Sequence, residues 1–473
     1  MKSIINYLTT FLYALLLISG GYSSADAQKV SYLDLARSNQ GGEQFFMKKM
    51  FLPGETDSTT NFVLMFKTSY NFLAFRKAND FETKRANEHK YFATLEMNIE
   101  MYKAPENQRL SSGDSFQSEG MESVEREFWR DTVFTKTYEQ TQAGNFFIEG
   151  YFNLPLPPGQ YGYILQLIRT AGAGEETSRQ QVISVPEYSS SNEQVYFLQP
   201  NSSMDDQKLP LINFGENVHF GKDFNALIYY PTYNPFKDYE LQVHKLRQLD
   251  DSTATDLVHS ETVTSDMMLN NYTLSMTGNS DLISLQMTST NSGKSFAFVS
   301  IPNSQFPNAT YRLRVLDKKN DELVSQKTYQ SHWVDMPTSL LSVDVALKML
   351  RFIIDEDKVD EMRKGSRAER RKAFEKFWTP KDPTPDTEFN ELMTEYYRRI
   401  DYAFRNFSTM RQPGYESDQG KTYIRVGPPK DIKREFPTSQ PVIEIWTYPD
   451  RTFIFEATTG FGDFKLVETR KNS

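Results

Sequence analysis

The sequence contains no cysteine in 473 residues. Disulfide bonds, thiol catalysis and thiolate metal sites are therefore excluded. Acylation as a lipoprotein is excluded as well, because that modification needs a cysteine at the cleavage site. The chain must gain its stability from hydrophobic cores, and its length predicts about three domains.

Histidine is scarce, and its distribution excludes further chemistry. The chain has 5 histidines, with no two of them at the spacing of paired metal ligands: His89, His219, His244, His259 and His332. The C-terminal third therefore lacks a His-based catalytic triad and a conventional zinc site, and the chain has no Gly-x-Ser-x-Gly motif. We expect no metal, no cofactor and no catalytic residue. An enzyme here would have to use carboxylates, tyrosine and arginine.

An excess of positive charge is also missing. The chain has 53 Lys and Arg against 62 Asp and Glu, which gives a net charge of −9. A nucleic-acid-binding protein needs a basic face to displace counterions from the phosphates. We therefore expect no nucleic-acid partner, and solubility is the simplest role of the charge.

Long apolar runs are absent after the first residues. The apolar stretch from about Ile4 to Ile18 is shorter than the ~20 residues that cross a bilayer. Lys2 precedes it, and Ala25-Asp26-Ala27 has the A-x-A form of a signal-peptide cleavage site. We predict that residues 1–27 are removed before Gln28. The mature chain, without a transmembrane segment, would then lie in the periplasm, at the outer membrane or outside the cell.

Residues 28–190 have the pattern of β-strands. The apolar run 61–66 and the alternating segment 91–99 are both bounded by polar turn residues. Phe and Tyr number 35 and 26, and these residues pack well on a pleated, half-buried surface. A β-rich N-terminal region follows from this pattern.

A Pro-x-x-x-Tyr pattern occurs twice, each time before an expected strand. Pro157 precedes Tyr161 and Pro307 precedes Tyr311, so the two tyrosines are 311 − 161 = 150 residues apart. We predict two successive β-sandwich (Ig-like) domains, residues 28–190 and 191–335. The alternative is that this turn is common in β-sandwiches and indicates no duplication.

The composition changes at about Met336, where helical periodicity begins. Apolar residues recur at helical spacing over 339–355, and a charged helical segment follows over 359–377. Thr384-Pro385 predicts the start of another helix, with an apolar stripe from Phe389 to Phe407. Short strands are expected at 422–426, 442–447 and 452–456. Helices followed by strands predict an α+β domain at 336–473.

The C-terminal third contains several short motifs in a fixed order: Phe377-Trp378, the segment 382–387, Asn390-Glu391 and the segment 396–399. In order and spacing they resemble the helical half of the GWxTD domain, which is found in a family of exported bacterial proteins. The motif itself is present as Gly414-Tyr415-Glu416-Ser417-Asp418, followed by Gly420. Tyr415 replaces its tryptophan and Ser417 its threonine, so an aromatic ring and a hydroxyl are kept. The resemblance implies an architecture and a cell-envelope location, but no activity.

Asp418 is the leading candidate for a functional side chain, because Gly414 and Gly420 frame it on a tight turn. It could act as a general base or a metal ligand. The alternative, which we favour, is a carboxylate that caps backbone N–H groups while Tyr415 packs.

A second candidate is a polar cluster next to the motif. Glu391 and Arg398, seven residues apart, share one helix face and could form a site with Asp418. The alternative is that Arg398 or Arg399 pairs with carboxylates to hold the helix in place. The full cluster comprises Asp382, Asn390, Glu391, Arg398 and Arg399. A basic run between Arg363 and Lys372 contains acidic neighbours, which favours a solvated helix face.

Two hypotheses of function follow from these residues. The first is a structural or protein-interaction module of the cell envelope that binds a protein partner. The second is a carboxylate-based enzyme or a glycan-binding protein, with Asp382, Glu391, Tyr415 and Asp418 lining a cleft. A deep pocket holding two or more of these carboxylates about 5–10 Å apart would favour a glycosidase-type enzyme.

Overall fold

The computed structural model describes most of the chain after the first thirty residues. The predicted signal peptide, residues 1–27, therefore lies outside the described residues. These are 31–38, 45–56, 58–78, 89–104, 121–144, 146–169, 175–177, 181–191, 193–246, 255–278, 282–291, 293–333, 336–437, 441–458 and 463–472. The chain divides into two compact units. We call Gly42–Asp335 with Pro383–Glu391 the β unit, and Met1–Gly41, Met336–Asp382 and Leu392–Ser473 the C-terminal unit.

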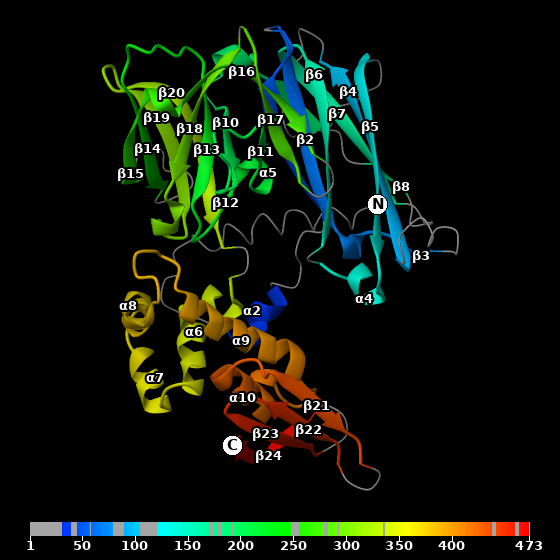
Figure 1. The fold of residues 1–473 in the computed structure, drawn as a ribbon, viewed down its shortest axis with the longest axis vertical. Helices are drawn as coiled ribbons and strands as arrows, with labels where there is room; N and C mark the ends of the chain where they lie inside the picture. Colours follow the sequence, from blue (N-terminus) through cyan, green and yellow to red (C-terminus); the bar gives the residue numbers. More distant parts are fainter. Residues whose placement is uncertain are drawn as a thin grey trace, which may run out of the picture. The chain divides into compact units, whose positions relative to one another are not determined.

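The described residues of the β unit form four sheets, whose strands are labelled in Figure 1. Sheet A has the order β1(Phe45–Pro53)-β2(Thr60–Ser69)-β6(Phe147–Leu156). Sheet B has the order β3(Arg76–Lys77)-β4(Tyr91–Lys103)-β7(Gly159–Arg169)-β8(Glu175–Thr177), with β5(Ser123–Thr135) on β4 and β9(Gln181–Val185) on β7.

The second half of the β unit contains the other two sheets. Sheet C has the order β10(Val195–Leu198)-β13(Phe224–Tyr230)-β18(Lys294–Ile301)-β16(Met268–Thr277)-β17(Ser284–Ser289)-β11(Lys208–Pro210). Sheet D has the order β12(Val218–His219)-β20(Glu322–His332)-β19(Thr310–Asp317)-β14(Tyr239–Leu246)-β15(Thr255–Val263). All these pairs are antiparallel except β12 with β20. Two short helices, α4(Tyr138–Thr141) and α5(Asn213–Glu216), lie between strands.

The four sheets stack in the order B, A, C, D, with an apolar cluster between each neighbouring pair. Sheet A is buried on both faces. On β2, Phe62 and Leu64 face sheet B, whereas Val63 and Met65 face sheet C. This double burial explains the unbroken apolar run at 61–66, because a strand covered on both sides has no solvent-facing position. The β-rich N-terminal region is as predicted, but the sequence did not predict the cluster that joins sheets A and C.

The repeated Pro-x-x-x-Tyr pattern makes the same contact in both places. The Tyr161 hydroxyl donates a hydrogen bond to the Pro157 carbonyl at 2.8 Å, and the Tyr311 hydroxyl donates one to the Pro307 carbonyl. Both tyrosines are buried. The pattern therefore folds into a tyrosine corner, which fixes the entry to β7 and to β19.

The C-terminal unit combines helices with one further sheet, sheet E (Figure 1). The sheet has the order β21(Asp431–Glu435)-β22(Ile443–Thr447)-β23(Arg451–Ala457)-β24(Phe464–Lys471). The helices are α2(Tyr32–Ser38), α6(Val343–Met349), α7(Glu356–Met362), α8(Arg367–Trp378), α9(Glu391–Phe407) and α10(Asp418–Val426). Helices precede strands, as the sequence predicted.

Helix α2 differs from the expected domain boundary. Residues from 28 onward were assigned to the first sandwich, yet α2 belongs to the C-terminal unit. Tyr32 is only 3% exposed and lies in the same apolar cluster as Tyr397 and Tyr415. A seven-residue segment with one aromatic side chain gives no periodicity from which this placement could be read.

Two local predictions in the C-terminal unit were wrong. No helix begins at Thr384; α9 begins at Glu391, and Phe389 instead packs in the β unit, with ring centroids 6.1 Å from Phe220 and 5.4 Å from Trp333. Residues 422–426 are the end of α10, not a strand. The β-branched residues there favour a strand locally, but an N-terminal cap and the burial of Ile424 on one face outweigh that preference.

Candidate functional site

The motif segment folds around Ser417. Residues Gly414–Glu416 form a single 3-10 turn, and α10 starts directly afterwards. The Ser417 hydroxyl accepts a hydrogen bond from the Gly420 N–H at 3.0 Å and donates one to the Gly414 carbonyl at 2.7 Å. This is the N-cap arrangement that serine and threonine provide. A hydroxyl at this position is therefore needed to start the helix.

The two glycines of the motif allow the backbones to touch. A Cβ added to Gly414 would lie 1.9 Å from the Ala403 carbonyl oxygen of α9. A Cβ added to Gly420 would lie 1.9 Å from the Gly414 carbonyl oxygen. A side chain at Gly414 would push the turn away from α9, and one at Gly420 would push α10 away from the turn, so both glycines serve close packing.

Tyr415 is part of the core, and it also contributes to the lining of one pocket. Its side chain is 7% exposed. Its ring lies edge-on to Tyr32 at 5.2 Å and contacts Phe352 and Phe404 at 6.2 and 6.1 Å. Burial raises the pKa of the Tyr415 hydroxyl above its usual value, so the side chain is uncharged at neutral pH and suits packing.

Asp418 holds the edge of sheet E. Its carboxylate accepts a hydrogen bond from the Leu466 N–H of β24 at 3.0 Å. As the first residue of α10, its negative charge also opposes the positive end of the helix dipole. The carboxylate thus satisfies a backbone donor, as the favoured alternative expected, but the donor lies on a distant strand, and the local cap is made by Ser417.

Two members of the predicted polar cluster, Glu391 and Arg399, make separate local contacts. Glu391 accepts a hydrogen bond from the Thr384 hydroxyl at 2.7 Å, and Arg399 pairs with Glu395 one turn earlier at 2.8 Å. Asn390 is buried, Arg398 is exposed and Asp382 is half-buried. Glu391 and Asp418 each accept a hydrogen bond from a different group, so neither is an uncommitted carboxylate.

Sequence reasoning missed a buried carboxylate on β22. Glu444 is 3% exposed and accepts hydrogen bonds from Gln419 Nε2 and Trp446 Nε1, each at 2.7 Å. Arg434 completes the cluster as an ion pair. The available signal was that Glu444 and Trp446 share one face of a short strand. This cluster ties the first turn of α10 to sheet E.

A second buried carboxylate, Asp401 on α9, binds the N-terminal segment. It accepts a hydrogen bond from the Tyr32 hydroxyl at 2.7 Å and one from the Thr338 N–H at 2.9 Å. Burial raises the pKa of Asp401 above its usual value. The carboxylate therefore joins two segments far apart in the sequence.

A pocket of about 670 Å³ lies beside Tyr415. Three arginines line this pocket: Arg351, Arg363 and Arg370. The last two belong to the predicted basic run, so part of that run faces the pocket. Each has a carboxylate partner: Arg351 pairs with Glu416, Arg363 with Asp360 at 3.6 Å and Arg370 with Asp344 at 2.8 Å. These ion pairs satisfy much of the positive charge that faces the pocket. The pocket holds none of Asp382, Glu391 and Asp418, so it does not match the cleft of the enzyme hypothesis.

The described part of the chain contains neither a cluster of metal ligands nor a membrane-spanning helix. No group of three or more His, Asp or Glu there could hold a metal ion. No helix in these same residues has the length and apolar composition to span a bilayer.

Comparison with known proteins identifies the C-terminal region. Residues 336–471 match the GWxTD domain. No curated protein sequence matches the chain.

Solved structures are similar only at a distant level. The C-terminal domain of the antigen I/II-family protein AspA of Streptococcus pyogenes is 11% identical, with a TM-score of 0.14, covering 61% of this chain and 100% of that one. The C-terminal domain of the BspA polypeptide of Streptococcus agalactiae is 12% identical, with a TM-score of 0.13 and coverage of 60% and 100%. The purple acid phosphatase PPD1 of yellow lupin is 9% identical, with a TM-score of 0.13 and coverage of 62% and 42%. These likenesses carry no argument about function.

Proposed function

From the GWxTD domain that this chain carries at residues 336–471, we infer that the protein is a structural or protein-interaction module of the bacterial cell envelope. It works without catalysis. The two sheet pairs of the β unit act as Ig-like sandwiches that present the C-terminal domain to a protein partner. One observation carries this proposal: the side chains of the motif are occupied by structural contacts. Ser417 and Asp418 accept hydrogen bonds from backbone N–H groups, and Tyr415 is buried in the core.

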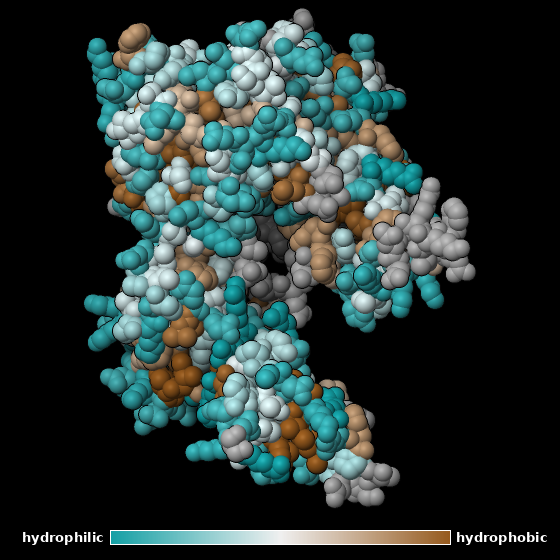
Figure 2. All heavy atoms as spheres, viewed as in Figure 1, coloured by the Kyte–Doolittle hydropathy of each residue, from teal (hydrophilic) through white to brown (hydrophobic). Residues whose placement is uncertain are grey.

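Exposed apolar side chains on sheet E support the binding role. Ile432 on β21 and Leu466 and Val467 on β24 are 50%, 38% and 55% exposed. β21 and β24 are the two edge strands of the sheet. Figure 2 shows apolar atoms on the surface of this region. Exposed apolar groups on the edge strands of a sheet favour contact with another protein.

Affinity purification from membranes tests the proposal. The tagged full chain should retain a defined protein partner, and Val467→Lys should lose that partner because a charge replaces an exposed apolar contact. Val124→Lys on β5, where the valine is 38% exposed, is the matched control and should retain it. A full chain that co-purifies with no protein would contradict the proposal.

A second variant separates the structural role of Asp418 from a catalytic one. Asp418→Asn keeps an oxygen that can accept the Leu466 N–H, so it should keep both the fold and the partner. A catalytic carboxylate would not tolerate this change, since an amide cannot take up a proton. Loss of function with an unchanged melting temperature in Asp418→Asn would favour the enzyme hypothesis.

The export proposal rests on the sequence of residues 1–27 and has its own test. N-terminal sequencing of the protein recovered from cells should begin at Gln28. A chain that begins at Met1 in the soluble cytoplasmic fraction would contradict it.

A further inference from the structure

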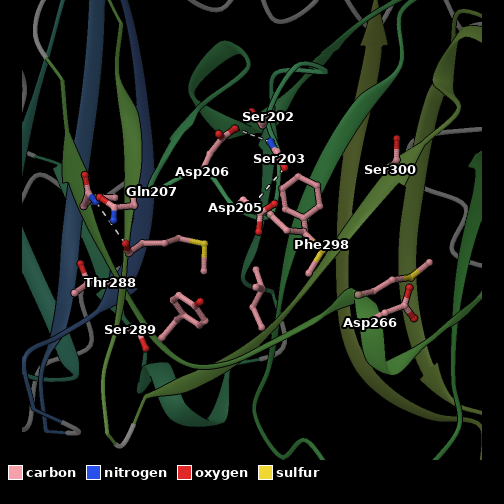
Figure 3. A pocket seen from close by; sticks show the side chains of 16 residues that line it. Ser202, Ser203, Asp205, Asp206, Gln207, Asp266, Thr288, Ser289, Phe298 and Ser300 are labelled. Carbon is pink, nitrogen blue, oxygen red and sulfur yellow. Dashed lines mark hydrogen bonds between the residues drawn. The ribbon is translucent and has the colours of Figure 1, made fainter.

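Sheet C carries a groove of about 980 Å³ outside the GWxTD domain (Figure 3). One wall is the loop of residues 202–207, and another is the 3-10 turn Ser265–Met267. Strands β16, β17 and β18 supply the rest of the lining. The groove is large enough for several side chains of a bound segment, since ligand sites of ~300–1,000 Å³ are typical.

The charge of the groove has one sign. Asp205, Asp206 and Asp266 line it and are exposed, and its described lining residues include no Lys or Arg. Asp206 is held in place, because it accepts a hydrogen bond from the Ser203 N–H at 2.7 Å. Hydrogen bonds from Thr264 and from its own backbone lower the pKa of Asp266, so this carboxylate stays charged. Anionic ligands are repelled, and a cationic ligand gains attraction from three carboxylates.

The floor of the groove is apolar. Leu269, Met287 and Phe298 belong to the cluster between sheets A and C, and all three line the groove. In the view of Figure 3, Phe298 lies between Asp205 and Asp266. Thioethers from Met204 and Met267 add flexible apolar surface beside this floor, and such surface adapts to different side chains.

The wall of the groove also includes unused hydrogen-bonding capacity. Ser202 is 9% exposed, and its hydroxyl has no hydrogen-bond partner among the described residues. Strand β11 pairs with β17 only at Ser284–Gln286. The Met287 N–H then donates to the Gln207 carbonyl at 2.9 Å. Alternate residues of a strand turn their backbone groups to opposite sides, so Ser289 presents its N–H and C=O along the same edge, beyond the end of β11.

We propose that this groove binds an extended segment of a partner protein in which an apolar side chain is flanked by Lys or Arg. The apolar side chain lies on Phe298 and Met287, and the basic side chains lie beside the three aspartates. The segment's backbone bonds the N–H and C=O of Ser289, the one position of β17 that lies on this edge beyond the end of β11. This inference goes beyond the proposed function, because it names a second surface and the chemistry of its partner.

Selection from a library of random ten-residue peptides on the immobilised full chain tests the proposal. Enriched peptides should contain an apolar residue next to Lys or Arg. Their affinity for the triple variant Asp205→Asn, Asp206→Asn, Asp266→Asn should be about tenfold lower, because three favourable charge interactions are lost. Asparagine keeps the acceptor oxygens, so the loop of residues 202–207 should fold unchanged.

A matched control removes the same number of charges elsewhere in the β unit: Glu122→Gln, Asp321→Asn and Glu322→Gln, all exposed in the structure. This variant should bind the enriched peptides as the unaltered chain does. Met204→Gln should weaken binding without lowering the melting temperature, because it places an amide on the apolar side of the groove. Equal binding by the aspartate variant and the unaltered chain would overturn the proposal. So would enrichment of acidic peptides, or the binding of neutral glycans on an array with no peptide enriched.

These outcomes are independent of the membrane purification. A partner that binds the C-terminal unit would still co-purify if the groove bound nothing. Peptides could equally bind the groove in a chain that retained no partner from membranes.

Discussion

Tyr32 offers the sharpest test of how the C-terminal unit is held together. Its ring lies 5.0 Å from that of Phe404 and 5.2 Å from that of Tyr415, and its hydroxyl donates to Asp401. Replacing a buried aromatic side chain with alanine costs about 3–5 kcal/mol. Loss of the hydrogen bond to a buried carboxylate adds about 1–3 kcal/mol. We expect Tyr32→Ala to destabilise the C-terminal unit by about 4 kcal/mol or more.

Tyr32→Phe divides this effect into its two parts. The ring contacts remain, and only the hydrogen bond to Asp401 is lost, so the expected cost is about 1–3 kcal/mol. Tyr138→Ala is the control, because Tyr138 is 60% exposed in the β unit and its loss should change stability by at most about 0.5 kcal/mol.

Hydrogen exchange followed by mass spectrometry localises the change. In Tyr32→Ala, amides of α9 and α10 should exchange about a thousandfold faster, because 1.4 kcal/mol corresponds to tenfold. Amides of β13 and β18 should keep their protection, since they lie in the β unit. If α9 and α10 exchange at the unaltered rate, the N-terminal segment is not part of this core and the reasoning fails.

Three further predictions concern single contacts. Gly414→Ala should lower the melting temperature, because the added Cβ would lie 1.9 Å from the Ala403 carbonyl oxygen and overpacking costs about 1–3 kcal/mol or more. Gly144→Ala is the control. Its added Cβ would lie 3.5 Å from the nearest atom, so the melting temperature should not change. Glu444→Ala should cost about 1–3 kcal/mol in urea unfolding for each of the two buried donors, Gln419 Nε2 and Trp446 Nε1, that it leaves without an acceptor. Burial lowers the pKa of Lys327 to about 8, whereas lysine in an unfolded chain has a pKa of about 10.4. At a pH between these two values, Lys327 is therefore protonated in the unfolded chain and loses its proton on folding. Stability should therefore rise with pH across this window, and Lys327→Met should flatten the rise in unfolding curves measured from pH 7 to 11.

The sequence predicted the strands of the N-terminal region well because local patterns determined them. The segments 61–66 and 91–99 are strands, and both Pro-x-x-x-Tyr patterns became tyrosine corners. In the region that follows residue 336, helices come first and strands second, and this order was predictable for the same reason.

Long-range packing set the features that the sequence did not predict. No local pattern places Tyr32 beside Asp401, because 369 residues separate them. Phe389 fits the apolar periodicity of α9 but packs on Trp333 in the β unit. Asp418 was recognisable as a candidate, whereas its partner, the Leu466 N–H, is a backbone group that no residue identity reveals.

The candidate groove was also beyond sequence reasoning. Asp205-Asp206 and Asp266 are about sixty residues apart in the sequence. They line the same groove, together with Phe298 of β18, only because the strands of sheet C bring their loops to one place. Acidic residues are common in exposed loops of any protein, so their positions in the sequence alone do not predict a binding site.

The burial of Tyr32 has a consequence for the order of assembly. Asp401, which lies 369 residues after Tyr32, is synthesised well after it, and so are Phe404 and Tyr415. Closing a loop of this length carries an entropic cost that must be met before the contact stabilises anything. Two segments on either side of the β unit in the sequence therefore complete one core together, and a chain interrupted anywhere between them leaves α2 without its partners.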